Sequence, residues 1–593
     1  MPRMLTSRPL HYLLLLLVAG VLFFPNLGAH ALWDVDEAHN AECAREMLDG
    51  ENWIVPTFNF VLRTDKPALL YWLMILAFKW FGVGEFAARF WSATCGVGST
   101  LLTYELGRRM FNPLTGLLAG VALASSFMFC VSSHAATPDA LLIFWVLATF
   151  LAFWRSYSHG GQGWLMVCGV TMGLAALAKG AVGLVLPVGI LGLFLIWERR
   201  LWMLLNWRLL AGLAIFALVA VPWYALVGHD TKGAFLRGFF LKHHVERFQQ
   251  PMEGHGGFFL FHPLVFLVTF APWSAFLGAT VWYALGRRGR GDSTSASAAA
   301  EPHLRPASPY RLLWCWFGVW LVFFSLAGTK LPNYILPAFP AFAILTGRFL
   351  ARWIEGEVQL SRAWMATAFG VVVAVGLAIS AGLVVVSGQL PQVPLDGRVF
   401  PELLYLAPVG LGFVLAGATS VVLLYRDRRG LAVGVVACSA VACLAVLAGV
   451  GPILVAEHKA PLALAEAIAQ HQQEPEVEIG CLGFYQPSLV FYTQRKIYNF
   501  AKPIEAVDHL HSVKQSYLLI PQGHWEQLRR QVEVPTTVVG SHWDFMAAQQ
   551  IVVVSNRPAN ARAGQALGGA TTASPVSPGP PTGSGQATSI TQR

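Results

Sequence analysis

The sequence predicts a mainly α-helical, polytopic membrane protein that ends in a small α/β domain. Of its 593 residues, 55% are hydrophobic and only 12% are charged, and the mean hydropathy is +0.54. A soluble protein carries about 25% charged residues. Runs of roughly 20 apolar residues, the length that crosses a bilayer as a helix, recur along most of the chain. After residue 455 these runs stop, and short strand-like segments follow.

The net charge of +9 has two explanations, a nucleic-acid partner or arginines that set membrane topology. The basic residues gather in short segments between apolar runs, which favours topology, because cytoplasmic loops are enriched in Lys and Arg. No nucleic-acid partner is therefore expected. The clusters are Arg3 and Arg8, Arg108 and Arg109, Arg155, Arg199 with Arg200 and Arg208, Arg287 to Arg311, Arg352 with Arg362, and Arg426 to Arg429.

The apolar runs between these clusters predict a bundle of about thirteen transmembrane helices. The amino-terminal run has a basic head but no small-residue cleavage site, so we interpret it as an uncleaved first span. The expected spans are 9–30, 86–107, 113–133, 139–157, 164–178, 181–197, 208–227, 258–285, 311–328, 333–351, 363–388, 402–425 and 431–453.

One further apolar segment, 66–82, is too short to be counted with the spans. If it crossed the membrane, every later arginine cluster would change sides. It is also rich in the aromatic residues that favour the membrane interface. We therefore expect an interfacial helix on the outer surface, with all arginine clusters in the cytoplasm. The membrane domain then covers residues 1–455, with outer loops at 33–85 and 228–257.

Three other regions complete the predicted organisation. Residues 286–310 are rich in Ser, Ala and Arg and predict a flexible cytoplasmic linker. Residues 456–557 predict an α/β domain on the outer side of the membrane, with a helix at HWEQLRRQV and strands at VEIGCLGF, SLVFYT, SYLLIP, TTVVGS and QQIVVVS. Residues 558–593 are rich in Gly, Pro, Ser, Thr and Ala and predict a disordered tail.

The first outer loop contains an unusual concentration of carboxylates, in WDVDEAHNAECAREM (33–47). Alanines and Met47 place an apolar stripe along 36–48, which predicts an amphipathic helix lying on the membrane. Such a helix can be a solvated surface feature only. It can also hold carboxylates at headgroup depth without the cost of burying them in hydrocarbon.

Further polar residues are predicted on the same outer side of the membrane. Each has a structural alternative: Lys66, Lys179 and Lys330 can be interfacial anchors, and Asp139 after Pro138 can cap its helix. Their common depth, together with Asp36 and Tyr334, is what a substrate with a charged headgroup requires. The second outer loop adds His243, His244 and His255, whose spacing matches no known metal motif.

The ordered motifs of the first 350 residues identify a family resemblance. DEAHNAECAREM, WIVP, DKPALLYW and FGVGEFAAR are followed by TPDALLIFW, GLAALAKGAVGLVLPV, HVERF, APW and KLPNYILPAF. This series resembles the lipid A aminoarabinose transferase family. That family belongs to the GT-C membrane glycosyltransferases, which include the protein O-mannosyltransferases. The resemblance implies a GT-C transmembrane bundle and a bacterial inner-membrane enzyme with a periplasmic active site.

The resemblance also implies roles for individual residues. The essential carboxylate corresponds to Asp36, with Glu37 beside it and Asp139 as a further catalytic carboxylate. Donor phosphate would be bound by Lys66 and Tyr334, with Lys179, Lys330 and His39 as additional contacts. A divalent metal such as Zn²⁺, as in one family member, would be held by Asp65 and His255. No nucleotide cofactor is implied.

The chain departs from the family pattern at three of these positions. Asp65 stands where the family has glutamate and reaches about one methylene less far. His39 replaces an arginine, so any positive charge there depends on pH. Asn40 replaces a tyrosine.

The function expected from the resemblance is transfer of a sugar from an undecaprenyl-type phosphate to an extracytoplasmic acceptor. The expected sugar is 4-amino-4-deoxy-L-arabinose or a relative of it, and the expected acceptor is lipid A. Two alternatives remain open at this point: a related enzyme that glycosylates protein hydroxyls, and a flippase or transporter of lipid-linked sugars. Transporters place polar residues at the membrane midplane and often contain internal repeats, whereas no obvious repeat is present here.

Overall fold

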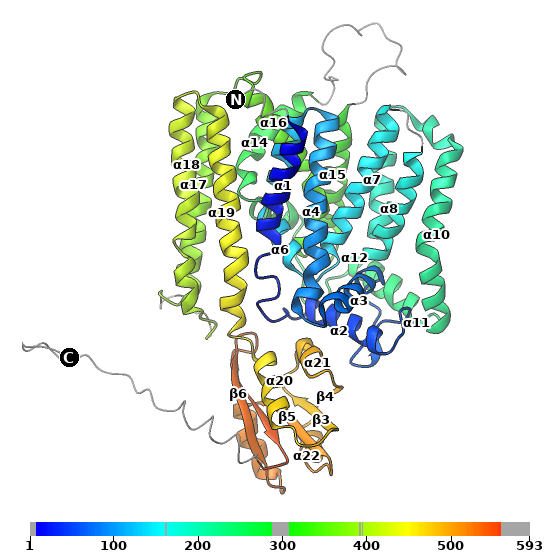
Figure 1. Cartoon of the computed structure of the whole chain (residues 1–593), viewed down its shortest axis with the longest axis vertical. Helices are drawn as coiled ribbons and strands as arrows, with labels where there is room; N and C mark the ends of the chain where they lie inside the picture. The colour runs from blue at the N-terminus through cyan, green and yellow to red at the C-terminus, as the bar shows by residue number, and fades with distance from the viewer. Residues whose placement is uncertain are drawn as a thin grey trace, which may run out of the picture.

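The computed structural model describes residues 7–159, 163–287, 308–390, 393, 395 and 397–558. An upright helical bundle carries an α/β domain at one end, which we call the domain end (Figure 1). Most of the predicted linker 286–310 and nearly all of the predicted tail 558–593 lie outside the described residues.

Every predicted span coincides with a helix or with helices in close succession. The bundle helices are α1 (Arg8–Phe23), α4 (Glu85–Met110), α5 (Pro113–Ala124), α6 (Phe127–His134), α7 (Asp139–His159), α8 (Trp164–Lys179), α9 (Val182–Trp197), α10 (Trp207–Asp230), α13 (Phe261–Thr269), α14 (Leu277–Arg287), α15 (Pro309–Leu326), α16 (Phe339–Ile354), α17 (Arg362–Val386), α18 (Val409–Tyr425) and α19 (Arg429–Ala456).

Length and composition alone give a smaller number of spans than the predicted thirteen. Within the described residues, seven helices are long and apolar enough to cross a membrane, or up to nine if each of two bent pairs is one span. The helices α1, α8 and α9 are apolar but have only 16 residues each. The helix α4 is long enough, but it carries buried polar residues such as Arg89, Ser99 and Thr103. The count of thirteen therefore remains a prediction.

Small residues let neighbouring bundle helices approach closely, as is common in membrane proteins. A Cβ atom at Gly169 of α8 would lie 2.1 Å from the carbonyl oxygen of Gly212 in α10. A Cβ atom at Gly173, one turn further along α8, would lie 2.8 Å from the Val219 side chain. This close packing fixes the end of α8, where Lys179 lies.

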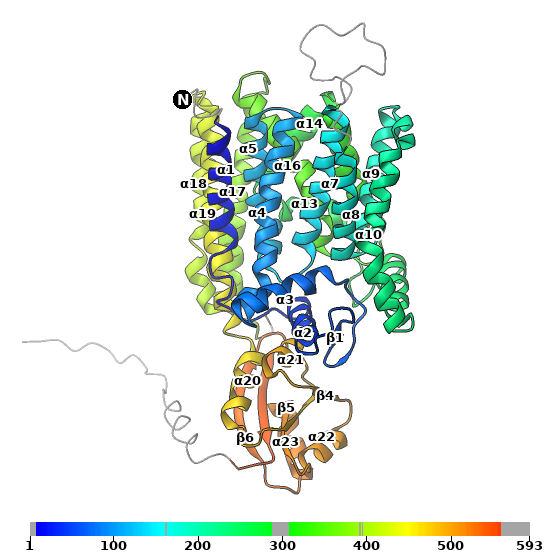
Figure 2. The ribbon, with the colours of Figure 1, turned by 45° about the vertical axis from the view of Figure 1, so that its right-hand side comes forward.

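Two helices from the first outer loop lie at the domain end of the bundle. They are α2 (Asp36–Asp49) and α3 (Leu69–Phe81), joined by a short hairpin of β1 (Thr57–Phe58) and β2 (Val61–Leu62). Figure 2 shows α3 lying crosswise beneath the upright helices. The orientation of α3 is the one expected of the interfacial helix that the sequence predicts over 66–82.

The second outer loop contains more regular structure than expected. It contains α11 (Ala234–Leu236), the π-helix η3 (Arg237–Glu246) and α12 (Arg247–Gln249). π-helical turns are rare and are frequently found at functional sites. This one contains His243 and His244, and Arg247 follows as the first residue of α12, at the domain end of the bundle.

The carboxyl-terminal region forms a five-stranded mixed sheet with the order β4-β3-β5-β7-β6. The strands are β3 (Val477–Leu482), β4 (Ile497–Phe500), β5 (Gln515–Pro521), β6 (Thr537–Asp544) and β7 (Gln549–Ser555). The helices are α20 (Ala460–His471), α21 (Pro487–Thr493), α22 (Pro503–Leu510) and α23 (Gln522–Leu528). The strands β4, β3 and β5 are parallel, whereas β7 is antiparallel to both β5 and β6.

One predicted strand is wrong, because SLVFYT lies in helix α21. Pro487 occupies the first helical position, where its fixed φ favours a helix start. Gln494 ends the helix with a left-handed φ of 51°. An apolar run this short cannot be assigned to strand or helix by its pattern alone. The strand β4, in contrast, was not predicted from the sequence.

A buried arginine from α4 holds the start of the acidic loop. The Arg89 guanidinium donates to both carboxylate oxygens of Glu37, at 2.9 and 2.7 Å, and to the carbonyls of Leu27, His30 and Ala31. Burial alone would raise the pKa of Glu37, but Arg89 and the backbone N–H groups of Trp33 and Ala136 hold that pKa below its ordinary value. The chain before α2 is therefore tied to the bundle.

Replacing Arg89 with alanine is expected to lower the free energy of unfolding by about 3–5 kcal/mol, because Glu37 loses its buried counter-charge. Thermal unfolding of the purified protein measures this loss. Arg362→Ala is the control, since its partner Asp427 and Arg362 itself are more than half exposed, and such pairs contribute at most about 1 kcal/mol. Equal losses in the two variants would contradict the assignment.

Candidate active site

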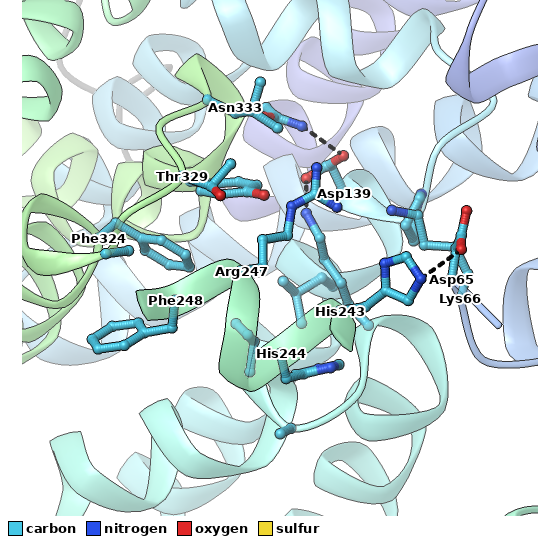
Figure 3. A pocket seen from close by; sticks show the side chains of 18 of the residues that line it. Asp65, Lys66, Asp139, His243, His244, Arg247, Phe248, Phe324, Thr329 and Asn333 are labelled. Atoms are coloured by element: carbon cyan, nitrogen blue, oxygen red, sulfur yellow. Dashed lines mark hydrogen bonds and ion pairs between the residues drawn. The ribbon is translucent and has the colours of Figure 1, made fainter. Parts of the chain in front are cut away.

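A cavity of about 930 Å³ opens at the domain end of the bundle. Its walls come from separated parts of the chain: the first outer loop, the start of α7, the end of α8 with the start of α9, the second outer loop, and the end of α15 with the segment after it. Figure 3 shows side chains from several of these parts around one space, among them the charged Asp65, Lys66, Asp139 and Arg247 and the uncharged Thr329 and Asn333.

Eight of the ten residues to which the family resemblance assigns a role line this cavity. They are Asp36, His39, Asp65, Lys66, Asp139, Lys179, His255 and Tyr334. The predicted convergence of both signs of charge at one depth is thus present in the structure. Asp36 and Lys66 share one space rather than lying at opposite ends of the bundle.

Most charges in the cavity wall neutralise one another. Three ion pairs involve Arg63 with Asp65 at 2.8 Å, Lys179 with Asp139 at 2.5 Å, and Arg247 with Glu253 at 3.1 Å. Within the part of the chain that the structure describes, neither Asp36 nor Lys66 has a hydrogen-bond or ion-pair partner. The wall therefore offers a substrate one available carboxylate and one available ammonium.

The two available groups still influence each other electrostatically. Burial lowers the pKa of Lys66 below its ordinary value, and the nearby Asp36 carboxylate opposes that shift. Asp36 is the first residue of α2 and is exposed to the cavity. Its position in the first turn suits a carboxylate, because the helix dipole favours negative charge there.

A second cluster forms where α7 and α8 meet the segment after α15. Asp139 accepts from Lys179 through one oxygen and from Asn333 Nδ2, at 3.2 Å, through the other. The Lys179 ammonium also lies 5.5 Å from the centre of the Tyr334 ring. The Asp139 carboxylate is thus fully engaged, whereas the Tyr334 ring forms part of the cavity wall.

His39 is a neutral residue in this setting. Burial, followed by the nearby Arg63, lowers the pKa of His39 to about 3. The ring packs edge-on against Phe58 with the ring centres 4.3 Å apart. At neutral pH His39 therefore supplies a hydrogen-bonding group in place of the positive charge that an arginine would bring.

Two predicted site residues do not line the cavity, and the structure corrects their placement. Glu37 is 3% exposed and engaged with Arg89, so it anchors the loop instead of meeting substrate. Lys330 donates to the carbonyls of Ser325 and Ala327, both at 2.6 Å, at the carboxyl end of α15. Its ammonium caps a helix and is not available to phosphate.

The predicted metal pair is not assembled as expected. The histidine beside Asp65 is His243, whose Nε2 lies 2.9 Å from Asp65 Oδ1, and not His255. The other Asp65 oxygen pairs with Arg63. Burial alone would raise the pKa of Asp65, but His243 and Arg63 together hold that pKa well below its usual range. Across the described ranges no three His, Cys, Asp or Glu side chains form a metal-binding group. These residues do not fit a protein-held metal centre.

Three functional candidates of the cavity wall were not selected in the sequence: Arg63, Arg247 and Asn333. His243 was named there as one of three histidines of the second outer loop, but it was not the one paired with Asp65. Arg63 lies two residues before the selected motif DKP and Asn333 lies within KLPNY, so their position was an available signal. The π-helix η3 and the turn into α12 bring His243 and Arg247 to the wall. No periodicity in the sequence predicts this π-helix.

The rest of the wall is apolar. It is formed by side chains such as Val182, Val185 and Leu186 of α9 and Trp320, Phe323 and Phe324 of α15. A cavity with an unpaired lysine at one side and an aliphatic and aromatic wall at the other suits an amphipathic ligand with an anionic head. The fixed ion pairs of the cavity wall can orient such a head group without reorganisation of the site.

Comparisons with known proteins identify relatives of this chain. The family model for dolichyl-phosphate-mannose-protein mannosyltransferase matches residues 10–231. An undecaprenyl phosphate-α-4-amino-4-deoxy-L-arabinose arabinosyl transferase from Erwinia tasmaniensis is 31% identical over 422 residues, covering 68% of this chain and 72% of the relative. The corresponding protein of Pseudomonas aeruginosa (strain UCBPP-PA14) is 31% identical over 352 residues, covering 58% and 60%. This chain thus spans about three fifths of that relative.

The overall architecture is that of a solved membrane protein. The crystal structure of ArnT from Cupriavidus metallidurans bound to undecaprenyl phosphate matches with a TM-score of 0.76. The match covers 92% of this chain and 98% of that one at 23% sequence identity. The predicted fold class, a GT-C bundle with a small carboxyl-terminal α/β domain, is confirmed.

Replacing Lys330 with methionine is expected to lower the free energy of unfolding by about 1 kcal/mol, because the last carbonyls of α15 lose a cationic cap. Undecaprenyl phosphate, the ligand of the related ArnT structure, is the probe. Its affinity, measured by intrinsic tryptophan fluorescence, is expected to stay within twofold of that of the parent protein. Lys66→Met is the matched comparison and is expected to lose that affinity. Strong loss of affinity in Lys330→Met would restore Lys330 as a phosphate contact.

Proposed function

The chain belongs to the undecaprenyl phosphate-aminoarabinose arabinosyl transferase family of membrane glycosyltransferases, and from this premise we propose that it transfers a sugar from a polyprenyl phosphate to an extracytoplasmic acceptor. The observation that carries the proposal is the pair of unpartnered charges, Asp36 and Lys66, in a cavity whose other lining charges are paired. A transferase of this kind needs a cation that stabilises the departing phosphate and a carboxylate that accepts a proton from the acceptor or orients it.

The donor is proposed to enter with its phosphate towards Lys66. Lys66 holds anions as a point charge, and Arg247 and Lys179 add positive potential from the same wall. The polyprenyl chain would follow the apolar wall of α9 and α15. Undecaprenyl phosphate, the ligand of the related ArnT structure, has this combination of head and tail.

The sugar is proposed to be 4-amino-4-deoxy-L-arabinose or a close relative, and the acceptor lipid A. The names of the matched transferases support the sugar. A neutral His39, where the family has arginine, leaves less positive charge beside the donor phosphate, so Lys66 carries more of its stabilisation.

The reaction is proposed as a single inverting displacement. An acceptor oxygen attacks C1 of the sugar while the bond from C1 to the donor phosphate oxygen breaks, and polyprenyl phosphate leaves with the bonding electrons. Lys66 stabilises the charge that develops on that phosphate. If the acceptor is a hydroxyl, Asp36 accepts its proton. If the acceptor is itself a phosphate, Asp36 orients it and stabilises positive charge at C1.

The domain end is proposed to face the periplasm of a bacterial inner membrane. The carboxyl ends of α4 and α9, with arginines in the last turn of α4 and directly after α9, lie at the opposite end of the bundle (Figure 2), and such clusters favour the cytoplasm. The placement of the cavity at one end, and not at the midplane, argues against the transporter alternative.

A protein hydroxyl acceptor remains a second candidate because of one specific observation. The matching family model describes protein mannosyltransferases and covers residues 10–231, which include Asp36 and Lys66. The two candidates share the donor side of the reaction and differ in the acceptor.

Mass spectrometry of lipid A and of envelope glycans and proteins, from cells with and without this protein, tests the proposal. A pentosamine on lipid A that depends on the protein supports the primary candidate. A protein-linked sugar supports the second. No change in any glycan or lipid would refute transferase activity.

Replacing Asp36 with asparagine is expected to reduce transfer at least about 100-fold, because the proton-accepting or orienting carboxylate is lost. Transfer from undecaprenyl-phosphate aminoarabinose to lipid A by the purified protein in liposomes measures the effect. Asp49→Asn at the other end of α2 is the control and should transfer normally, since its side chain is 58% exposed outside the cavity. Retained transfer in Asp36→Asn would refute the role.

Affinity for undecaprenyl phosphate is expected to fall as the pH rises from neutral to alkaline. Burial lowers the pKa of Lys66, so the ammonium is fully charged only below that lowered pKa and is neutralised as the pH rises through it. Binding titrations at a series of pH values measure the effect. In Lys66→Arg the loss should move to higher pH, because arginine stays charged. An unchanged profile in Lys66→Arg would contradict the assignment.

A further inference from the structure

The α/β domain contacts the acidic loop directly before Asp36. The carboxylate of Asp34 accepts from the Ser488 backbone N–H at 2.8 Å and from the Ser488 hydroxyl at 2.7 Å. The Lys459 ammonium lies 3.3 Å from the same carboxylate. Both charged side chains are 1% exposed, so this ion pair is shielded from solvent.

The same loop has further contacts with the domain. Lys459 also donates to the Leu32 carbonyl, and its ammonium lies 5.2 Å from the centre of the Trp33 ring. The Tyr492 hydroxyl accepts from the Leu32 N–H at 2.8 Å and donates to Glu85 of α4 at 2.9 Å. Tyr492 thus joins the loop and the bundle through one side chain of the domain.

A second contact lies on the chain segment that leads to Lys66. Asn59, in the turn between β1 and β2, donates to the Ile497 carbonyl at 2.8 Å and accepts from the Ile497 N–H at 2.9 Å. The chain then runs through β2 directly to Lys66. The domain therefore holds the chain two residues before Asp36 and seven residues before Lys66.

We propose that the α/β domain is a positioning element of the transfer reaction, in which Lys459 and Ser488 fix Asp34 and so set Asp36 opposite Lys66. The inference rests on the proposed function. Neither Lys459 nor Ser488 lines the cavity, so they act through Asp36 and are positioning residues. Displacement of a catalytic group by about 1 Å can cost about 100-fold in rate, so a buried anchor two residues away is sufficient to matter.

A purely structural anchor would have a different consequence. Loss of such an anchor lowers the amount of folded protein, and the folded fraction then works at the normal rate. Loss of a positioning contact lowers kcat in folded protein while the KM for the donor is preserved, because Lys66 and the apolar wall that bind it are unchanged. The two roles are separated by kcat and KM per folded molecule.

The test uses the full-length protein in liposomes, with undecaprenyl-phosphate aminoarabinose and lipid A as substrates. Lys459→Met removes the buried charge, and Ser488→Ala removes one hydrogen bond but keeps the ion pair, so it guards against misfolding of the first variant. Ser488→Thr retains the hydroxyl and is the rescue. Lys514→Met, whose partner Glu476 and Lys514 itself are about half exposed or more, is the control from the same domain.

The expected result is a loss of kcat of about 10- to 100-fold in Lys459→Met and a smaller loss in Ser488→Ala. The KM for the donor should stay within twofold, and Ser488→Thr and Lys514→Met should behave like the parent. A normal kcat per folded molecule in both Lys459→Met and Ser488→Ala would overturn the inference, as would a loss confined to KM. If the parent protein itself transfers no sugar, the proposed function fails instead.

Discussion

The geometry of the site depends on the buried contact between Arg89 and Glu37. One guanidinium neutralises the carboxylate and ties down three carbonyls of the preceding chain, so a loop that leaves the first helix is held against α4. Breaking such a pair costs more than making it contributes, because the remaining charge stays buried. The contact leaves Glu37 no part in chemistry, but it fixes the point from which α2 starts. Asp36 is the first residue of α2, directly before Glu37, and its carboxylate lines the cavity.

The electrostatics of the cavity follow from this frame. Arg63, Lys179 and Arg247 are each matched by an acidic partner, and the buried cation of Lys330 is satisfied by backbone carbonyls. Within the described part of the lining, Asp36 and Lys66 are left to interact with substrate. The α/β domain contacts the chain segments that lead to Asp36 and to Lys66, at Asp34 and at Asn59. The bundle and the domain together hold the two available charges in one space.

The sequence predicted much of this because spans and motifs are local features. The positions of the bundle helices, the crosswise helix α3 and eight cavity residues could be predicted from apolar runs and short patterns. The errors arose where individual contacts decide, because apolar patterns do not show them. Nothing near Glu37 indicates that Arg89 would engage it. Lys330 donates to carbonyls only a few residues before it, but no pattern in the sequence shows that its ammonium turns back to cap α15. The π-helix η3 places His243, and not His255, beside Asp65. The run SLVFYT forms α21 because it is too short for its pattern to separate helix from strand.

The central claim is that donor phosphate and acceptor meet between Lys66 and Asp36 at the domain end of the bundle. An electron cryo-microscopy structure of the protein in a lipid nanodisc, with undecaprenyl-phosphate aminoarabinose bound, tests it most directly. The account predicts phosphate density within hydrogen-bonding distance of the Lys66 ammonium, C1 of the sugar facing Asp36, and the polyprenyl chain along α9 and α15. Phosphate density outside this cavity, or a sugar turned away from Asp36, would contradict it.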